Sequence, residues 1–196
     1  MLLTPKGYTN IGQIQNYLLT TIKDYFQPQV EDWIAKMEKY IERETSRVFI
    51  ADDSASEKLY DGNGKINLFV EENVEVSKVT IDSDEVSGDD YITYPANETP
   101  KSRIKLKDSA GFLFSKGEQN IKVEAKWGYS VECPADIAFA ATVLAAGVIN
   151  FSGEMKGEIE SEKIGDYSVT YKKSKDWQDF QRAKEILENY RKIIIA

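Results

Sequence analysis

The chain has 196 residues, a net charge of −8, a single cysteine at Cys133 and no histidine. This length suits one domain, or a small domain with an insert, and a hydrophobic content of 41% is enough for an ordinary core. Without histidine, Ser-His-Asp and Cys-His catalysis and imidazole metal sites are excluded, which leaves carboxylate-only mechanisms open. We expect no membrane span and no signal peptide, and the lone cysteine fits synthesis in a reducing cytoplasm.

Two helices are expected in the first third of the chain. Thr9 or Asn10 is placed to cap a helix that runs to about Ile22, and the pair at 27–28 breaks it. A second helix then begins near Pro28, because proline is tolerated in a first turn, and ends within residues 45–47. The apolar side chains that recur at helical spacing, and that we expect to face inward, are Trp33, Ile34, Met37, Tyr40 and Ile41.

The middle third is expected to form strands. Residues 57–60 and 66–70 flank an Asp-Gly-Asn-Gly sequence at 61–64, which predicts a hairpin between them. Further strands are expected at 74–81, 91–94, 103–107 and 120–127.

The negative charge of the chain is concentrated in this middle third. Residues 51–99 hold 13 acidic and 3 basic side chains, a balance of −10, which leaves +2 for the rest of the chain. No basic surface is therefore gathered for gripping duplex DNA. A solvated, soluble surface is by itself a sufficient explanation for this acidity.

The last third is expected to begin with a helix opened by Pro134, whose small residues form one packing face. A polar, mobile loop is expected at 152–161, then a Gly-Asp turn at 165–166 and a strand over 167–171. An amphipathic helix follows, with Phe180, Ala183, Ile186, Leu187 and Tyr190 on one face.

Together these elements predict an α+β fold, a small bundle of about four helices with a β-rich insert between the second and third helices. Residues 1–50 and 128–196 would form the helical core, with a short strand near 164–172. Residues 51–127 would form the β-rich insert.

Two acidic motifs suggest chemistry at first sight. Residues 61–66 resemble the centre of an EF-hand loop, but Leu59 and Val70 stand where its first ligand and its bidentate Glu belong, so we expect a plain turn and no metal. Glu158, Glu160 and Glu162 alternate, which would place carboxylates on one face of a strand. A glycosidase needs two such carboxylates, but a flexible acidic loop explains the same pattern.

Aromatic residues and the cysteine are the other candidates. Trp127, Tyr129, Tyr91 and Tyr94 would form a platform for sugar or single-stranded nucleic acid, although we favour core and cross-strand packing for them. Cys133 has no basic neighbour in the sequence and is expected to be inert.

Four blocks of the chain resemble a known family in their order. They are residues 30–49, which end in Tyr-Ile-Glu-Arg-x-Thr-x-Arg-x-Phe, then Lys-Trp-Gly-Tyr at 126–129, Pro-Ala-Asp-Ile at 134–137, and residues 162–171 with the helix behind them. This series resembles the head–tail connectors of tailed phages, the head-completion adaptors that dock under the portal. Residues 51–117 match the family pattern less clearly.

The resemblance implies a virion structural protein without catalysis, cofactor or metal, located at the head–tail interface. It implies a ring, dodecameric in the family, that contacts the portal and a downstream head-completion or tail protein and lets DNA pass without sequence-specific binding. The C-terminal isoleucines would enter either the chain's own core or a groove of a partner. The portal-docking candidates that follow are Phe180, Leu187, Tyr190, Ile193, Ile194 and Ile195.

Two alternatives from other classes remain at this point. One is a β-rich tail module that binds a receptor or a carbohydrate, which would need surface aromatics in a groove. The other is a carboxylate-only hydrolase, which would need a deep acidic pocket.

Overall fold

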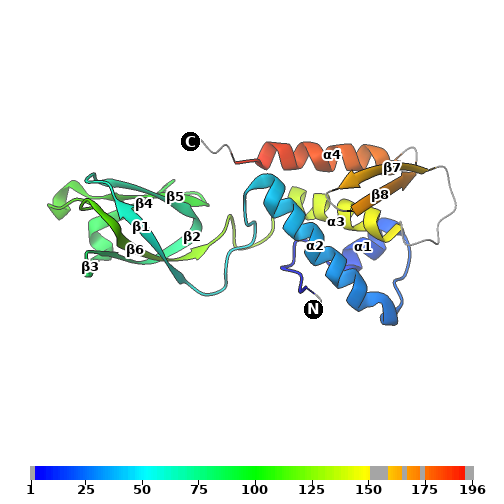
Figure 1. Cartoon of the computed structure of the whole chain (residues 1–196), viewed down its shortest axis with the longest axis horizontal. Coiled ribbons are helices and arrows are strands. Elements are labelled where there is room, and N and C mark those ends of the chain that lie inside the picture. Colours follow the sequence, from blue (N-terminus) through cyan, green and yellow to red (C-terminus); the bar gives the residue numbers. More distant parts are fainter. Residues whose placement is uncertain (1–2, 151–158, 165–166, 173–174, 193–196) are drawn as a thin grey trace. The chain divides into compact units, whose positions relative to one another are not determined.

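The computed structural model describes residues 3–150, 159–164, 167–172 and 175–192, and the chain divides into two compact units (Figure 1). Unit 1 consists of Met1–Arg47 and Cys133–Ala196, and unit 2 of Val48–Glu132. The predicted α+β class is confirmed, since the main sheet lies between the second and third helices in the sequence. The helices are α1 (Ile11–Leu18), α2 (Gln27–Thr45), α3 (Ala135–Asn150) and α4 (Lys175–Tyr190).

Helix α3 forms the centre of unit 1, because α1, α2, α4 and strand β8 all pack against it. Every residue from Ala140 to Ile149 is buried. The sequence predicted a single small-residue packing face, and this prediction was too narrow. A helix that is apolar on all sides is one that other elements surround, and the small alanine side chains let them approach closely.

Helix α1 begins at its predicted capping residue but ends early. Asn10 caps α1, since its Oδ1 accepts from the backbone N–H of Gln13, whose side chain returns to the backbone N–H of Asn10. The helix ends at Leu18, four residues earlier than predicted, because Leu19 adopts a left-handed conformation with φ of 53°. Ile22 is buried nevertheless, at 7% exposure, outside the helix.

A two-stranded sheet precedes α4 and corrects the predicted loop. Strand β7 (Ile159–Ile164) pairs antiparallel with β8 (Tyr167–Lys172), with Ile164 opposite Tyr167. Residues 159–161 are thus strand rather than loop, because β8 supplies hydrogen-bond partners that local sequence does not show. The rest of the predicted loop, and the turn at 165–166, lie outside the described residues.

Unit 2 is built on an antiparallel sheet with the strand order β1-β6-β2-β5-β4, and β3 pairs with β2. Inward strand side chains such as Ile104 and Val123 form one core together with Phe114, which lies outside the strands. The strands are β1 (Ser56–Gly62), β2 (Asn67–Ile81), β3 (Asp84–Val86), β4 (Tyr91–Tyr94), β5 (Lys101–Leu106) and β6 (Gly117–Trp127).

The hairpin predicted around residues 61–64 is wrong. Strands β1 and β2 do not pair with each other, because β6 lies between them. Residues 61 and 62 belong to β1, and the chain bends after them, at Gly64, toward Phe114. The N–H of Gly64 donates to the carbonyl of Phe114 at 2.7 Å, and the N–H of Phe114 donates to the carbonyl of Lys65 at 3.0 Å.

Strand β2 joins two predicted strands into one of 15 residues. Register shifts interrupt its pairing around Asn73, which is fully buried and donates from its side-chain amide to the carbonyls of Glu71 and Lys101. Asn73 thereby binds backbone carbonyls where the ladder is irregular. Strand β3 is not among the predicted strands. Asp82 and Ser83, both with positive φ, turn the chain back into it.

A set of carboxylates on α2 holds the N-terminal arm, residues 3–9. Glu38, only 2% exposed, accepts hydrogen bonds from three successive backbone N–H groups, those of Lys6, Gly7 and Tyr8. Gly7 has φ of 105°, which lets these N–H groups converge on one anion. Asp32, nearer the start of α2, accepts a hydrogen bond from the N–H of Leu3 at 3.0 Å. We call Asp32, Glu38 and Glu42 the arm clamp.

The arm clamp should make unit 1 sensitive to acid. The backbone hydrogen bond from Leu3, with the side-chain hydrogen bond and the charge of Lys36, lowers the pKa of Asp32. Burial raises the pKa of Glu42, but hydrogen bonds from Lys39, Tyr8 and Lys6 outweigh it and lower the pKa overall. A carboxyl group whose pKa is lowered in the folded state stabilises the fold at a pH above its ordinary pKa. This stabilisation is lost as the pH falls through the lowered pKa. We expect Tm to fall below about pH 4.5, less steeply in Asp32→Asn, as thermal unfolding against pH would show; equal slopes would contradict this.

Candidate docking surface at the end of the last helix

Helix α4 carries three of the six docking candidates within the described residues. Phe180 is fully buried and Leu187 is 6% exposed, so both side chains belong to the core of unit 1. Tyr190 is half-buried, and its hydroxyl donates to Asp136 Oδ1 at 3.2 Å. Ile193, Ile194 and Ile195 lie outside the described residues.

The C-terminal ends of α2 and α4 lie side by side and cap each other. Arg47, just past the end of α2, donates from Nε to the carbonyl of Tyr190 at 2.6 Å, the last residue of α4. Arg191, just past the end of α4, donates from Nε to the carbonyl of Glu44 at 3.1 Å. Each guanidinium thus meets the last carbonyls of the other helix, where the helix dipole favours a positive charge.

A third hydrogen bond and an ion pair complete this arrangement, which we call the helix-end lock. The N–H of Lys192 donates to the carbonyl of Thr45 at 2.9 Å. Arg191 Nη2 lies 3.3 Å from Glu44 Oε2. The lock therefore fixes the last described residue of the chain against the end of α2.

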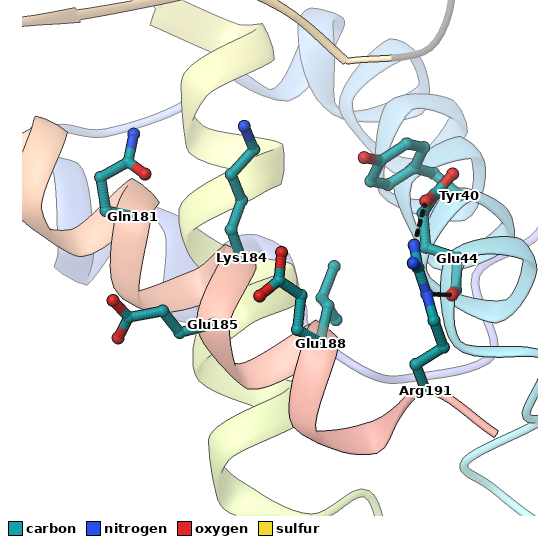
Figure 2. A pocket seen from close by; sticks show the side chains of 8 residues that line it. Tyr40, Glu44, Gln181, Lys184, Glu185, Glu188 and Arg191 are labelled. Carbon is teal, nitrogen blue, oxygen red and sulfur yellow. Dashed lines mark hydrogen bonds and ion pairs between the residues drawn. The ribbon is translucent and has the colours of Figure 1, made fainter. Parts of the chain in front are cut away.

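A groove of about 380 Å³ runs between α2 and α4 next to the lock. Figure 2 shows Tyr40 and Glu44 from α2 on one side and Gln181, Lys184, Glu185 and Glu188 from α4 on the other, with Arg191 reaching toward Glu44. Leu187 also lines it. The groove is therefore lined mainly by charged and polar side chains, with Leu187 as a small apolar part.

Sequence reasoning missed the lock and the arm clamp. The signal for the lock was present, because Arg47 and Arg191 lie within two residues of a helix end, where basic residues cap carbonyls. The signal for the clamp was Glu38, a charged residue on the inward face of α2 beside Met37. The partner of each of these side chains lies in a distant segment of the chain, and only the structure shows it.

The four aromatic residues considered for ligand binding do not gather. Trp127 is 5% exposed, and its indole N–H donates to the carbonyl of Ser56 at 2.8 Å. Tyr129 packs against Phe49, with ring centroids 5.7 Å apart, and Tyr94 stacks with Arg103. Tyr91 is partly buried and packs against the core of unit 2. The packing interpretation favoured from the sequence therefore describes these side chains.

Cys133 matches the expectation of an inert thiol. Burial, with the charges of Glu38 and Asp136, raises its pKa to about 12. A thiol with this pKa carries almost no thiolate near neutral pH, and the thiolate is the reactive form.

The acidic motifs serve local structure in the described part of the chain. Asp61 accepts from the N–H of Gln119, and Asn63 from the N–H of Lys65, so the turn expected at 61–66 uses these oxygens itself. Glu160 and Glu162 lie in β7, and Glu158 is outside the described residues. A hollow of about 330 Å³ in unit 2 has Asp52, Asp53 and Glu75 on its lining, where Glu75 forms a surface ion pair with Lys126.

Within the described ranges, no group of three or more Cys, Asp or Glu side chains is placed to hold a metal ion. None of the helices there has the length and apolar character that a bilayer span requires.

Comparison with known proteins gives a family and a fold. A model of the family described as head completion protein matches residues 8–193. A chain from the neck of an empty gene transfer agent particle, computed with C6 symmetry, has a TM-score of 0.60 at 14% identity, over 100% of this chain and 95% of that one. A chain from the virion of a native gene transfer agent particle has a TM-score of 0.55 at 12% identity, with the same coverage. No curated protein sequence matches.

The family match defines the class of this molecule as a structural protein of the head–tail region of a phage virion. The chain belongs to the head completion protein family. The resemblance that its sequence predicted is thereby confirmed, and the two gene transfer agent chains share its fold.

Proposed function

We propose that this head completion protein is a head–tail connector adaptor that docks on the portal through its C-terminal segment. The observation that carries the proposal is the helix-end lock. Its hydrogen bonds hold residues 190–192 against the end of α2. The three isoleucines that follow, Ile193 to Ile195, therefore start from a fixed point on the surface of unit 1.

A fixed starting point favours docking. A short apolar segment that must bind in a partner's groove loses less conformational entropy when its base is already held. Phe180 and Leu187 belong to the core instead. In this proposal their part is to hold α4 in place, Tyr190 and the lock position the segment, and Ile193–Ile195 make the contact.

Self-association into a ring around the DNA path is the second part of the proposal. A similar fold occurs in the neck of a particle computed with C6 symmetry, which agrees with a copy number that is a multiple of six, such as twelve. The net charge of −8 supports a conduit, because a neutral or acidic lining lets the duplex pass without gripping it. The downstream partner would be another head-completion or tail protein.

Catalysis has no part in this proposal. The family is a structural one, the chain has no histidine, and the inert thiol of Cys133 offers no nucleophile. Docking and shape then account for the whole function, without a cofactor or a metal.

Removing residues 193–196 tests the docking. We expect the truncated chain to lose portal recovery by at least about tenfold, which corresponds to about 1.4 kcal/mol or more of docking free energy. The fold should persist, because the bond from Lys192 to Thr45 remains. Tagged pull-down from particle-producing cells, with mass spectrometry of the recovered proteins, measures the binding, and circular dichroism measures the fold.

Removal of Ala196 alone is the matched control, since it shortens the chain but keeps the three isoleucines. This control should recover the portal as the full chain does. A chain without residues 193–196 that still recovers the portal, or that unfolds, argues against the docking role.

A further inference from the structure

Two large apolar side chains project from the connection between α1 and α2. Leu19 is 92% exposed and Tyr25 is 81% exposed. Single exposed apolar residues are common, but Leu19 also has a left-handed backbone with φ of 53°, a position at the end of a helix that favours glycine. Leucine at such a site has a backbone cost that glycine would not have.

The connection is nevertheless held firmly. Ile22 lies between the two exposed residues and is buried, and Phe26 packs edge-on against Trp33 with ring centroids 5.4 Å apart. The N–H of Phe26 also donates to the carbonyl of Lys23 at 2.9 Å. Leu19 and Tyr25 are therefore presented on an ordered base, and we call them the exposed pair.

The groove between α2 and α4 is lined mainly by polar and charged side chains, with Leu187 and the ring of Tyr40 as its apolar part. Its volume of about 380 Å³ lies within the range of about 300–1,000 Å³ that binding pockets span, and its floor includes the side chain of Leu187. Exposed carboxylates, Glu185 and Glu188, stand on its rim (Figure 2). Lys23, whose Nζ lies 5.9 Å from the ring centroid of Tyr25, would bring a positive charge to them.

The exposed pair and the groove lie at opposite ends of α2. The connection precedes the first turn of the helix, whereas Tyr40 and Glu44 of the groove are in its last turns, about 20–25 Å further along the axis at 1.5 Å per residue. One copy therefore cannot fill its own groove. We infer that the exposed pair of one copy of this chain enters the groove of the next copy, a head-to-tail contact that repeats around a ring.

This inference rests on the proposed ring and names its contact. Cysteine cross-linking tests it in particles whose only copy of the chain is the double variant Leu19→Cys/Glu188→Cys. Both positions are exposed, and the native Cys133, with a pKa of about 12, reacts poorly with a bis-maleimide. We expect a ladder of cross-linked chains beyond the dimer, because a head-to-tail contact propagates from copy to copy.

The matched control is Leu19→Cys/Glu118→Cys, which places the second thiol at an exposed position of unit 2. We expect at least about ten times less cross-linked chain from it. No ladder from the first variant, or one equally strong from the control, overturns the inference.

Leu19→Gly is the second variant, because glycine accepts the left-handed backbone and keeps the fold. We expect an unchanged or higher Tm together with fewer copies per particle, and an unchanged copy number would overturn the inference. Ladder formation reports contacts between copies, whereas portal recovery reports docking. A chain that recovers the portal without a ladder refutes this contact alone, and a chain with a ladder that recovers no portal refutes the docking alone.

Discussion

Replacing Phe180 by alanine is expected to destabilise unit 1 by about 3–5 kcal/mol, the range for truncating a fully buried aromatic side chain. Phe180 has no exposed surface, and its ring lies 5.9 Å from that of Trp177. The truncation would leave a cavity where α4 packs against α3. Since whole domains are stable by only about 5–15 kcal/mol, denaturant unfolding should show a large shift in midpoint.

Gln178→Ala is the matched control, because Gln178 is exposed on the same helix, and its effect should stay within about 0.5 kcal/mol. A Phe180→Ala chain as stable as the control would contradict the core assignment. A Phe180 variant that fails to recover the portal must therefore first be shown to be folded, because unfolding alone would abolish recovery.

Replacing Glu38 by glutamine is expected to cost about 2–4 kcal/mol, although the two side chains have nearly the same shape. The carboxylate of Glu38 is buried and accepts from three successive N–H groups of the N-terminal arm. Glutamine removes the charge that strengthens these bonds and turns an NH₂ group toward N–H donors. Thermal unfolding measures the loss of stability.

Hydrogen exchange then locates the effect of Glu38→Gln. The amides of Gly7 and Tyr8 should exchange about tenfold faster or more, because local opening of the arm becomes easier. Glu31→Gln, at an exposed position of the same helix, should change neither stability nor exchange. If the Glu38 variant leaves the exchange of both amides as it was, the arm is held by other contacts.

Sequence patterns predicted the elements that local chemistry determines. The Asn10 cap, the start of α2 near Pro28 and the start of α3 after Pro134 all follow from backbone rules that act within one turn. The pairing of strands does not follow from such rules. Residues 61–62 extend β1, and the chain bends only after them. Strand β1 pairs with β6, more than 50 residues away in the sequence, and no local signal encodes this choice.

The candidate site shows the same division. The apolar face of α4 was predictable from its 3.6-residue period, whereas the burial of Phe180 and Leu187 depends on α3 covering that face. The roles of Arg47 and Arg191 depend on two helices ending at the same place. Such meetings of distant segments belong to the tertiary structure, so a sequence indicates only which residues are able to take part.

The ends of unit 2 are joined to each other in a way that bears on how such proteins diversify. Ile50 forms a parallel bridge with Ser130, and the N–H of Tyr129 donates to the carbonyl of Val48 at 2.8 Å. The chain thus enters and leaves the unit at one place, as inserted domains commonly do. An ancestor could therefore have gained, enlarged or exchanged this module by recombination within a single loop, while the helices of unit 1 kept their own packing.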